Sequence, residues 1–124
     1  MEYQRITQSE IETIKEAQKG NELAFNKLFN RYKEFVDNVL FHYVNDMDEA
    51  KDLTNVVFLK VHQKLSTFTD YSSFGGWLRI IANRTAIDYL RKVKKYWQQR
   101  DELYLPRSMG LPRSMERLVQ NRSE

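Results

Sequence analysis

The chain has 124 residues, no cysteine, and hydrophobic side chains at 41% of its positions. This length allows one ordinary domain and a tail, and the apolar content is enough to form a core, which argues against a disordered chain. The lack of cysteine excludes disulfides, thiolate nucleophiles and cysteine-ligated metal centres. Two prolines, four glycines and little strand-like alternation predict an all-α fold.

The net charge of +3 is divided unevenly along the chain. Residues 1–76 contain nine Lys and Arg against twelve Asp and Glu, whereas residues 77–124 contain eleven against five. Opposite charge at the two ends suits two different partners, one of which could be a nucleic acid, although a basic end can also serve solubility alone. Because no apolar run approaches the roughly 20 residues of a membrane span, we expect no membrane association and a cytoplasmic location.

Two helices are predicted in the first part of the chain. Thr7 and Glu10 form a capping-box pattern that starts a short amphipathic helix, and Gly20 ends it. Asn21 caps a longer helix with helical periodicity of its apolar residues. Its expected inward positions are Phe25, Leu28, Phe29, Tyr32, Val36, Val39, Leu40 and Tyr43.

A third helix is expected to begin at Asp46 or Asp48, where acidic residues favour a helix N-terminus. Its predicted inward stripe contains Ala50, Leu53, Val57, Val61 and Leu65. The opposite face mixes carboxylates with apolar groups, namely Asp48, Asp52, Asn55, Leu59 and His62. This pattern fits either a protein-docking surface or a solvated helix face with a stray leucine.

The stretch "STFTDYSSFGG" at 66–76 is predicted to be an ordered loop. Its three aromatic residues either return to the core or are presented for stacking. A last helix is expected from Phe74 to about Tyr96. Its predicted inward residues are Trp77, Leu78, Ile81, Ala82, Thr85, Ala86, Tyr89, Leu90 and Val93, and its predicted outward residues are Arg79, Asn83, Arg84, Arg91, Lys92 and Lys95.

Residues 97–124 are expected to form a flexible basic linker or tail. This part contains both prolines, and the pentapeptide Leu-Pro-Arg-Ser-Met occurs at 105–109 and again at 111–115. The repeat is either a short binding peptide or a chance duplication. One weak helical turn is expected near residues 115–119.

Sequence motifs for catalysis are missing. His42 and His62 lie on separate predicted helices without the spacing of paired metal ligands, and Gly75 with Gly76 is too short a pattern to indicate a phosphate loop. We therefore expect no metal, no cofactor and no enzymatic activity. An outward basic helix beside an aromatic loop instead favours the binding of opened or flipped nucleic-acid bases.

Four segments together resemble region 2 of the extracytoplasmic-function (ECF) sigma factors of bacterial RNA polymerase. They are "AFNKLFNRY" at 24–32, the acidic "DEAKDLTNVVFLKV" at 48–61, the loop, and "WLRIIANRTAIDYLRK" at 77–92. The resemblance covers residues 11 to about 96. It implies a compact four-helix bundle-like domain over residues 1–96, with promoter recognition and melting as its function.

The resemblance also implies roles for individual residues. It assigns to one group of residues the docking of the domain on the clamp helices of the largest subunit of core RNA polymerase. These residues are Asp48, Glu49, Asp52, Asn55, Phe58 and Leu59. Capture of a flipped base of the promoter −10 element falls on Phe68, Thr69, Asp70, Tyr71, Ser72, Ser73 and Phe74. The resemblance assigns contact with promoter DNA and its opened non-template strand to a third group. Its members are Arg79, Asn83, Arg84, Asp88, Arg91, Lys92 and Lys95. An anti-sigma factor is a further implied partner.

The sequence departs from the family pattern in three places. Asn55 and Val56 stand where the family usually has Gln-Glu, and "RIIANR" at 79–84 replaces the usual "YRIARN". Family members usually have a second domain, region 4, which contains a helix-turn-helix, and residues 97–124 are too few to form it. The chain is thus either a fragment or a stand-alone region 2, and the alternative function is a sigma-like module that binds polymerase or an anti-sigma partner without melting promoters.

Overall fold

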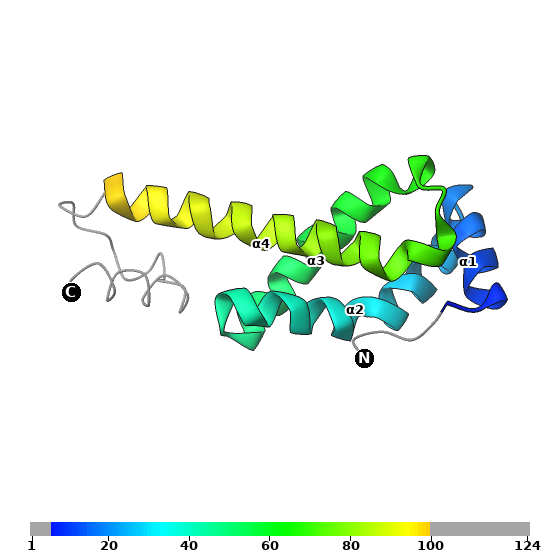
Figure 1. Ribbon diagram of the computed structural model, residues 1–124, viewed down its shortest axis with the longest axis horizontal. Helices are drawn as coiled ribbons and strands as arrows, with labels where there is room; N and C mark the ends of the chain where they lie inside the picture. Colours follow the sequence, from blue (N-terminus) through cyan, green and yellow to red (C-terminus); the bar gives the residue numbers. More distant parts are fainter. Residues whose placement is uncertain (1–5, 100–124) are drawn as a thin grey trace.

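The computed structural model describes residues 6–99, and this part of the chain is built from helices alone (Figure 1). The α-helices are α1 (Gln8–Gln18), α2 (Glu22–Val44), α3 (Met47–Lys64) and α4 (Phe74–Gln99). Two 3-10 turns, η1 (Leu65–Thr67) and η2 (Tyr71–Ser73), lie in the loop between α3 and α4. The predicted all-α fold is confirmed.

The predicted starts of α1 and α2 are confirmed at the level of hydrogen bonds. The Glu10 backbone N–H donates to Thr7 Oγ1 at 3.1 Å, and the Thr7 backbone N–H donates to Glu10 Oε1 at 3.3 Å. Asn21 Oδ1 accepts from the Ala24 backbone N–H at 3.1 Å. Between the two helices Gly20 has φ +96°, a conformation that favours glycine.

A very short connection joins α2 to α3. Asn45 ends α2 in the left-handed conformation, with φ 57°, and its N–H donates to the Phe41 carbonyl at 2.8 Å. Asp46 is the N-cap of α3 and accepts from the Glu49 N–H at 3.0 Å. Asparagine is one of the few residues that tolerate this backbone geometry. The turn therefore folds α3 back along α2.

The core lies between the inward stripes of the helices. All five residues predicted for the inward stripe of α3 are buried. The prediction for Tyr43 is wrong, because this side chain near the end of α2 is 37% exposed. The largest fully buried side chains are Phe74, Ile14, Leu28, Leu40, Leu78, Val36, Val44, Val57 and Val61.

One ion pair ties α1 to α2. Arg31 Nε donates to Glu10 Oε2 at 2.5 Å, and this hydrogen bond raises the pKa of Arg31 above its ordinary value. Ile14 is fully buried on the same side of α1. Since a helix of this length is marginal in isolation, these tertiary contacts are what hold α1 in place.

α4 extends well beyond the other helices (Figure 1). Its last buried residue is Ala86, and the helix continues past the predicted end near Tyr96 to Gln99. The remainder of the predicted tail, with the Leu-Pro-Arg-Ser-Met repeat and the helical turn at 115–119, lies outside the described residues. Within residues 6–99 no helix has both the length and the apolar character required to cross a bilayer.

Candidate functional site

The exposed side of α3 carries most of the residues expected to dock on a protein partner. Asp48, Asp52 and Asn55 are exposed, and Leu59, which follows them along the helix, is 65% exposed. We call these four residues the α3 face. Glu49 lies to one side, where its Oε2 accepts from the Tyr89 hydroxyl of α4 at 2.6 Å. Glu49 therefore joins two helices.

The structure corrects the expectation for Phe58. Its side chain is only 4% exposed and packs edge-on against Phe29, with ring centroids 5.0 Å apart, and against Phe25 at 6.4 Å. Adjacent residues on a helix point about 100° apart, so Phe58 faces α2 while Leu59 faces outward. Phe58 thus belongs to the core and not to the α3 face.

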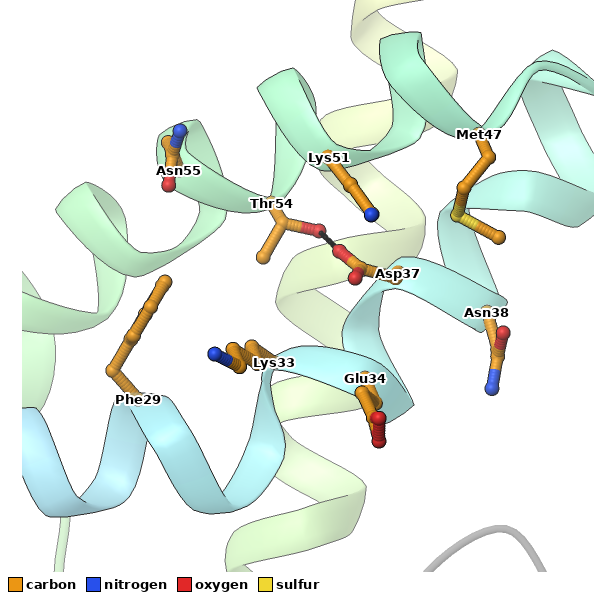
Figure 2. A pocket seen from close by; sticks show the side chains of 9 residues that line it. All are labelled: Phe29, Lys33, Glu34, Asp37, Asn38, Met47, Lys51, Thr54 and Asn55. Atoms are coloured by element: carbon orange, nitrogen blue, oxygen red, sulfur yellow. Dashed lines mark hydrogen bonds between the residues drawn. The ribbon is translucent and has the colours of Figure 1, made fainter.

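A groove of about 600 Å³ lies between α2 and α3, next to the α3 face (Figure 2). No local sequence pattern predicts this groove, because its two walls come from different helices. At its base the Thr54 hydroxyl donates to Asp37 Oδ1 at 2.5 Å, and both residues are buried. The residues that line it are Phe29, Lys33, Glu34, Asp37, Asn38, Met47, Lys51, Thr54 and Asn55.

The groove is electrostatically mixed. Lys33 from α2 and Lys51 from α3 extend into the space between the helices, Lys51 toward the Asp37 carboxylate, whereas Glu34 points away from that space (Figure 2). Lys33 Nζ also lies 5.8 Å from the centre of the Phe29 ring. Such a lining can receive one polar or amphipathic side chain of a partner through charge-assisted hydrogen bonds.

The aromatic residues of the loop return to the core. Phe74 is fully buried and Phe68 is 8% exposed, so neither offers a free ring face to a base. Phe68 stacks on Trp77 with centroids 4.5 Å apart and planes at 28°, and Tyr71 meets the edge of Phe68 at 6.0 Å. Of the two alternatives, core packing holds for Phe68 and Phe74, and the assignment of these two rings to direct DNA contact is corrected.

The exposed part of the loop is polar. Thr69, Asp70, Ser72 and Ser73 are all exposed. The hydroxyls of Ser72 and Ser73 donate to the Asp70 carboxylate at 3.0 and 2.9 Å. Both hydroxyl protons are thus used within the cluster, which leaves acceptor oxygens at the surface for the polar edge of a base.

The outward side of α4 carries basic residues as expected. Arg84, Arg91, Lys92 and Lys95 are exposed, and so is Asp88, whose Oδ1 lies 4.0 Å from an Arg91 nitrogen.

Two other predicted DNA-contacting residues of α4 are less accessible. Arg79 is half-buried. Asn83 is half-buried too, and its Oδ1 accepts from the Tyr43 hydroxyl of α2 at 3.1 Å.

Sequence reasoning missed two exposed apolar residues on the same side of α4. Ile80 is 49% exposed and Ile87 is 42% exposed, one on each side of Arg84 along the helix. Their spacing of seven residues puts them on one side of α4, opposite the buried stripe, and this signal was available from the sequence. We call Ile80, Arg84, Ile87 and Arg91 the α4 face.

Metal-binding geometry is not found in the described residues. Residues 6–99 contain no cluster of three or more His, Asp or Glu side chains arranged to hold an ion. His42 and His62 are both exposed, and the His62 ring packs edge-on against Phe25 at 5.0 Å.

Comparison with known proteins places this arrangement in a family. The Sigma-70 region 2 pattern matches residues 28–96, which include the groove, the loop and the α4 face. The chain is 32% identical over 85 residues to the ECF RNA polymerase sigma factor BldN of Streptomyces coelicolor, covering 68% of this chain and 32% of that protein.

Two further relatives have the same description. The chain is 28% identical over 81 residues to the ECF RNA polymerase sigma factor SigW of Bacillus subtilis, covering 65% of this chain and 43% of the relative. It is 36% identical over 77 residues to the ECF RNA polymerase sigma-E factor of Escherichia coli K12, covering 62% and 40%. This chain therefore belongs to the sigma-70 region 2 family, in its ECF branch, and spans less than half the length of these relatives.

Proposed function

We propose that this chain is a transcription initiation factor domain that binds core RNA polymerase, recognises the promoter −10 element and traps the melted non-template strand. The observation that carries the proposal is the continuity of two surfaces. The polar loop that ends at Ser73 leads directly into α4, whose exposed side holds cations and isoleucines. One strand could contact both surfaces without a break.

The α3 face with the adjoining groove is the proposed polymerase-docking surface, with the clamp helices of the largest subunit as its partner. Leu59 offers an exposed apolar contact, and the exposed carboxylates of Asp48 and Asp52 precede it on the same helix. Asn55 belongs to both the α3 face and the groove. Apolar contacts rimmed by charges are typical of protein interfaces.

Base capture would act through hydrogen bonds at the loop tip. Asp70 and Ser73 offer acceptor oxygens to the edge of a flipped base, since the Ser73 hydroxyl proton is donated to Asp70. The buried rings of Phe68, Phe74 and Trp77 support the loop from below. Of the two alternatives left open by the sequence, stacking of a base on these rings is not used, since Phe68 already stacks on Trp77.

The α4 face would hold the opened strand. Arg84 and Arg91 can neutralise phosphates, and the exposed side chains of Ile80 and Ile87 can contact unpaired bases or thymine methyl groups. Spontaneous opening of an A·T-rich segment would then be trapped by binding, and no ATP hydrolysis is needed. In this role the protein is not an enzyme and acts in the cytoplasm with its polymerase.

Run-off transcription tests the proposal. The full chain is added to its cognate core polymerase on promoter templates whose −10 segment is either paired or already opened by mismatches. Transcripts that depend on the chain and decrease with Arg84→Ala support the function. The matched control is Lys27→Ala, which removes an exposed cation from α2. No chain-dependent transcript on either template type would contradict promoter melting and strand capture.

The alternative is a sigma-like module that binds polymerase or an anti-sigma factor without melting DNA. The α3 face favours it, because the exposed Leu59 beside exposed carboxylates suits a protein partner without any contact with DNA. Polymerase binding without transcripts, lost in the double variant Asp52→Ala with Leu59→Ala, would support this module. Leu23→Ala is the matched control, because Leu23 is 75% exposed on α2.

A further inference from the structure

One amide of α1 holds the loop between α3 and α4. Gln18 Nε2 donates to the Leu65 carbonyl at 2.9 Å and to the Phe68 carbonyl at 2.6 Å. Gln18 Oε1 accepts from the Tyr71 hydroxyl at 2.9 Å. A single side chain thus joins α1 to three points of a loop about 50 residues further along the chain.

The orientation of this amide is determined by its partners. Carbonyl oxygens can only accept, so the NH₂ group must face Leu65 and Phe68, and both of its donors are used. The oxygen is then left to receive the proton of Tyr71. No other side chain of similar length offers two donors and one acceptor in this arrangement without a charge.

The rest of the loop is held mainly by local bonds. The Phe68 N–H donates to the Leu65 carbonyl at 3.0 Å, and the Ser73 N–H donates to the Asp70 carbonyl at 2.9 Å. Such short-range bonds define turns but do not fix where the loop lies relative to the helices. The burial of Phe68 against Trp77 ties the loop to α4, and Gln18 adds the hydrogen-bonded link to α1. Lys15 Nζ adds a cation contact 5.3 Å from the Tyr71 ring.

We propose that Gln18 is a positioning residue for base capture. It contacts no DNA itself but holds the loop so that Asp70 and Ser73 are already in place when a base arrives. A loop ordered in advance loses less conformational entropy on binding, which increases affinity. This inference rests on the proposed function of the loop.

The test uses the full chain and a single-stranded A/T-rich DNA oligonucleotide with the −10 sequence of a promoter that the wild type transcribes. Fluorescence anisotropy gives the affinities of wild type, Gln18→Leu and the matched control Gln8→Leu, which changes an exposed glutamine at the other end of α1. We expect Gln18→Leu to bind about tenfold more weakly, a change on the order of 1.4 kcal/mol. The control should bind as the wild type does.

A second oligonucleotide separates positioning from general damage. It has the same length but lacks the base at the captured position. On this abasic strand the wild type and Gln18→Leu should bind equally, since only the contacts of the α4 face remain. A loss of affinity that persists on the abasic strand would overturn the positioning role. Circular dichroism and polymerase affinity should be unchanged in the variant.

Tyr71→Phe removes one of the three hydrogen bonds and keeps the ring. It should weaken binding less than Gln18→Leu, and the two changes together should be no worse than Gln18→Leu alone, because they share that bond. If the wild type fails to bind either oligonucleotide, base capture itself is refuted and the role of Gln18 falls with it. If the wild type binds and Gln18→Leu binds equally well, only the role of Gln18 is refuted.

Discussion

Phe58 and Leu59 are neighbours on α3, but their substitution by alanine should affect the free energy of unfolding very differently. Phe58 is 4% exposed and packs against two phenylalanine rings of α2, whereas Leu59 is 65% exposed. Truncation of a buried phenylalanine to alanine costs about 3–5 kcal/mol, through lost burial and the cavity that remains. Small domains unfold with a free energy of only about 5–15 kcal/mol, so Phe58→Ala should remove a large part of the stability.

Leu59→Ala should leave the free energy of unfolding within about 0.5 kcal/mol, because leucine and alanine are both good helix formers and little packing is lost. Urea denaturation followed by circular dichroism measures both values. In thermal melts, the midpoint of Phe58→Ala should fall by at least roughly 12 °C, at about 4 °C for each kcal/mol. Equal midpoints for the two variants, or a greater loss in Leu59→Ala, would refute the assignment of Phe58 to the core and Leu59 to the α3 face.

Other variants test separate features of the domain. Gly20→Ala should destabilise the fold by about 1–2 kcal/mol in urea denaturation, because φ +96° strains any side chain although the space around it is open; an unchanged midpoint would contradict this. Thr54→Val should cost about 1–3 kcal/mol by leaving a buried carboxylate without its donor, whereas the exposed Thr67→Val should not. Arg84→Ala should weaken binding to single-stranded −10 DNA and reduce the slope of log affinity against log salt by about 0.7, and a slope equal to that of Lys27→Ala would show that Arg84 does not contact a phosphate.

The caps and periodicity of the helices could be predicted because they depend on neighbouring residues. Thr7, Glu10, Asn21 and Asp46 cap their helices through contacts at most three residues away. The inward stripe of α3 was likewise predicted, since the helical repeat fixes which residues share a side.

The predicted surfaces were less accurate. A helical repeat orders residues around a helix, but the width of the stripe that becomes covered depends on the neighbouring helix. The family resemblance assigned Phe58 to the docking surface although α2 covers it, and the helical repeat placed Tyr43 inside although nothing covers it fully. The exposure of Ile80 and Ile87 differs, because the helical repeat by itself puts them opposite the buried stripe of α4.

By itself, the sequence determined that the chain is all-α, where its helices start and turn, and which family pattern they follow. Tertiary structure decided what the loop presents, because the packing of α2 and α4 draws Phe68 and Phe74 inward and leaves Asp70 and Ser73 outside. It also brought Gln18 to the loop and created the groove between α2 and α3. Contacts between segments so far apart in sequence arise only when the helices pack, and no local pattern of residues encodes them.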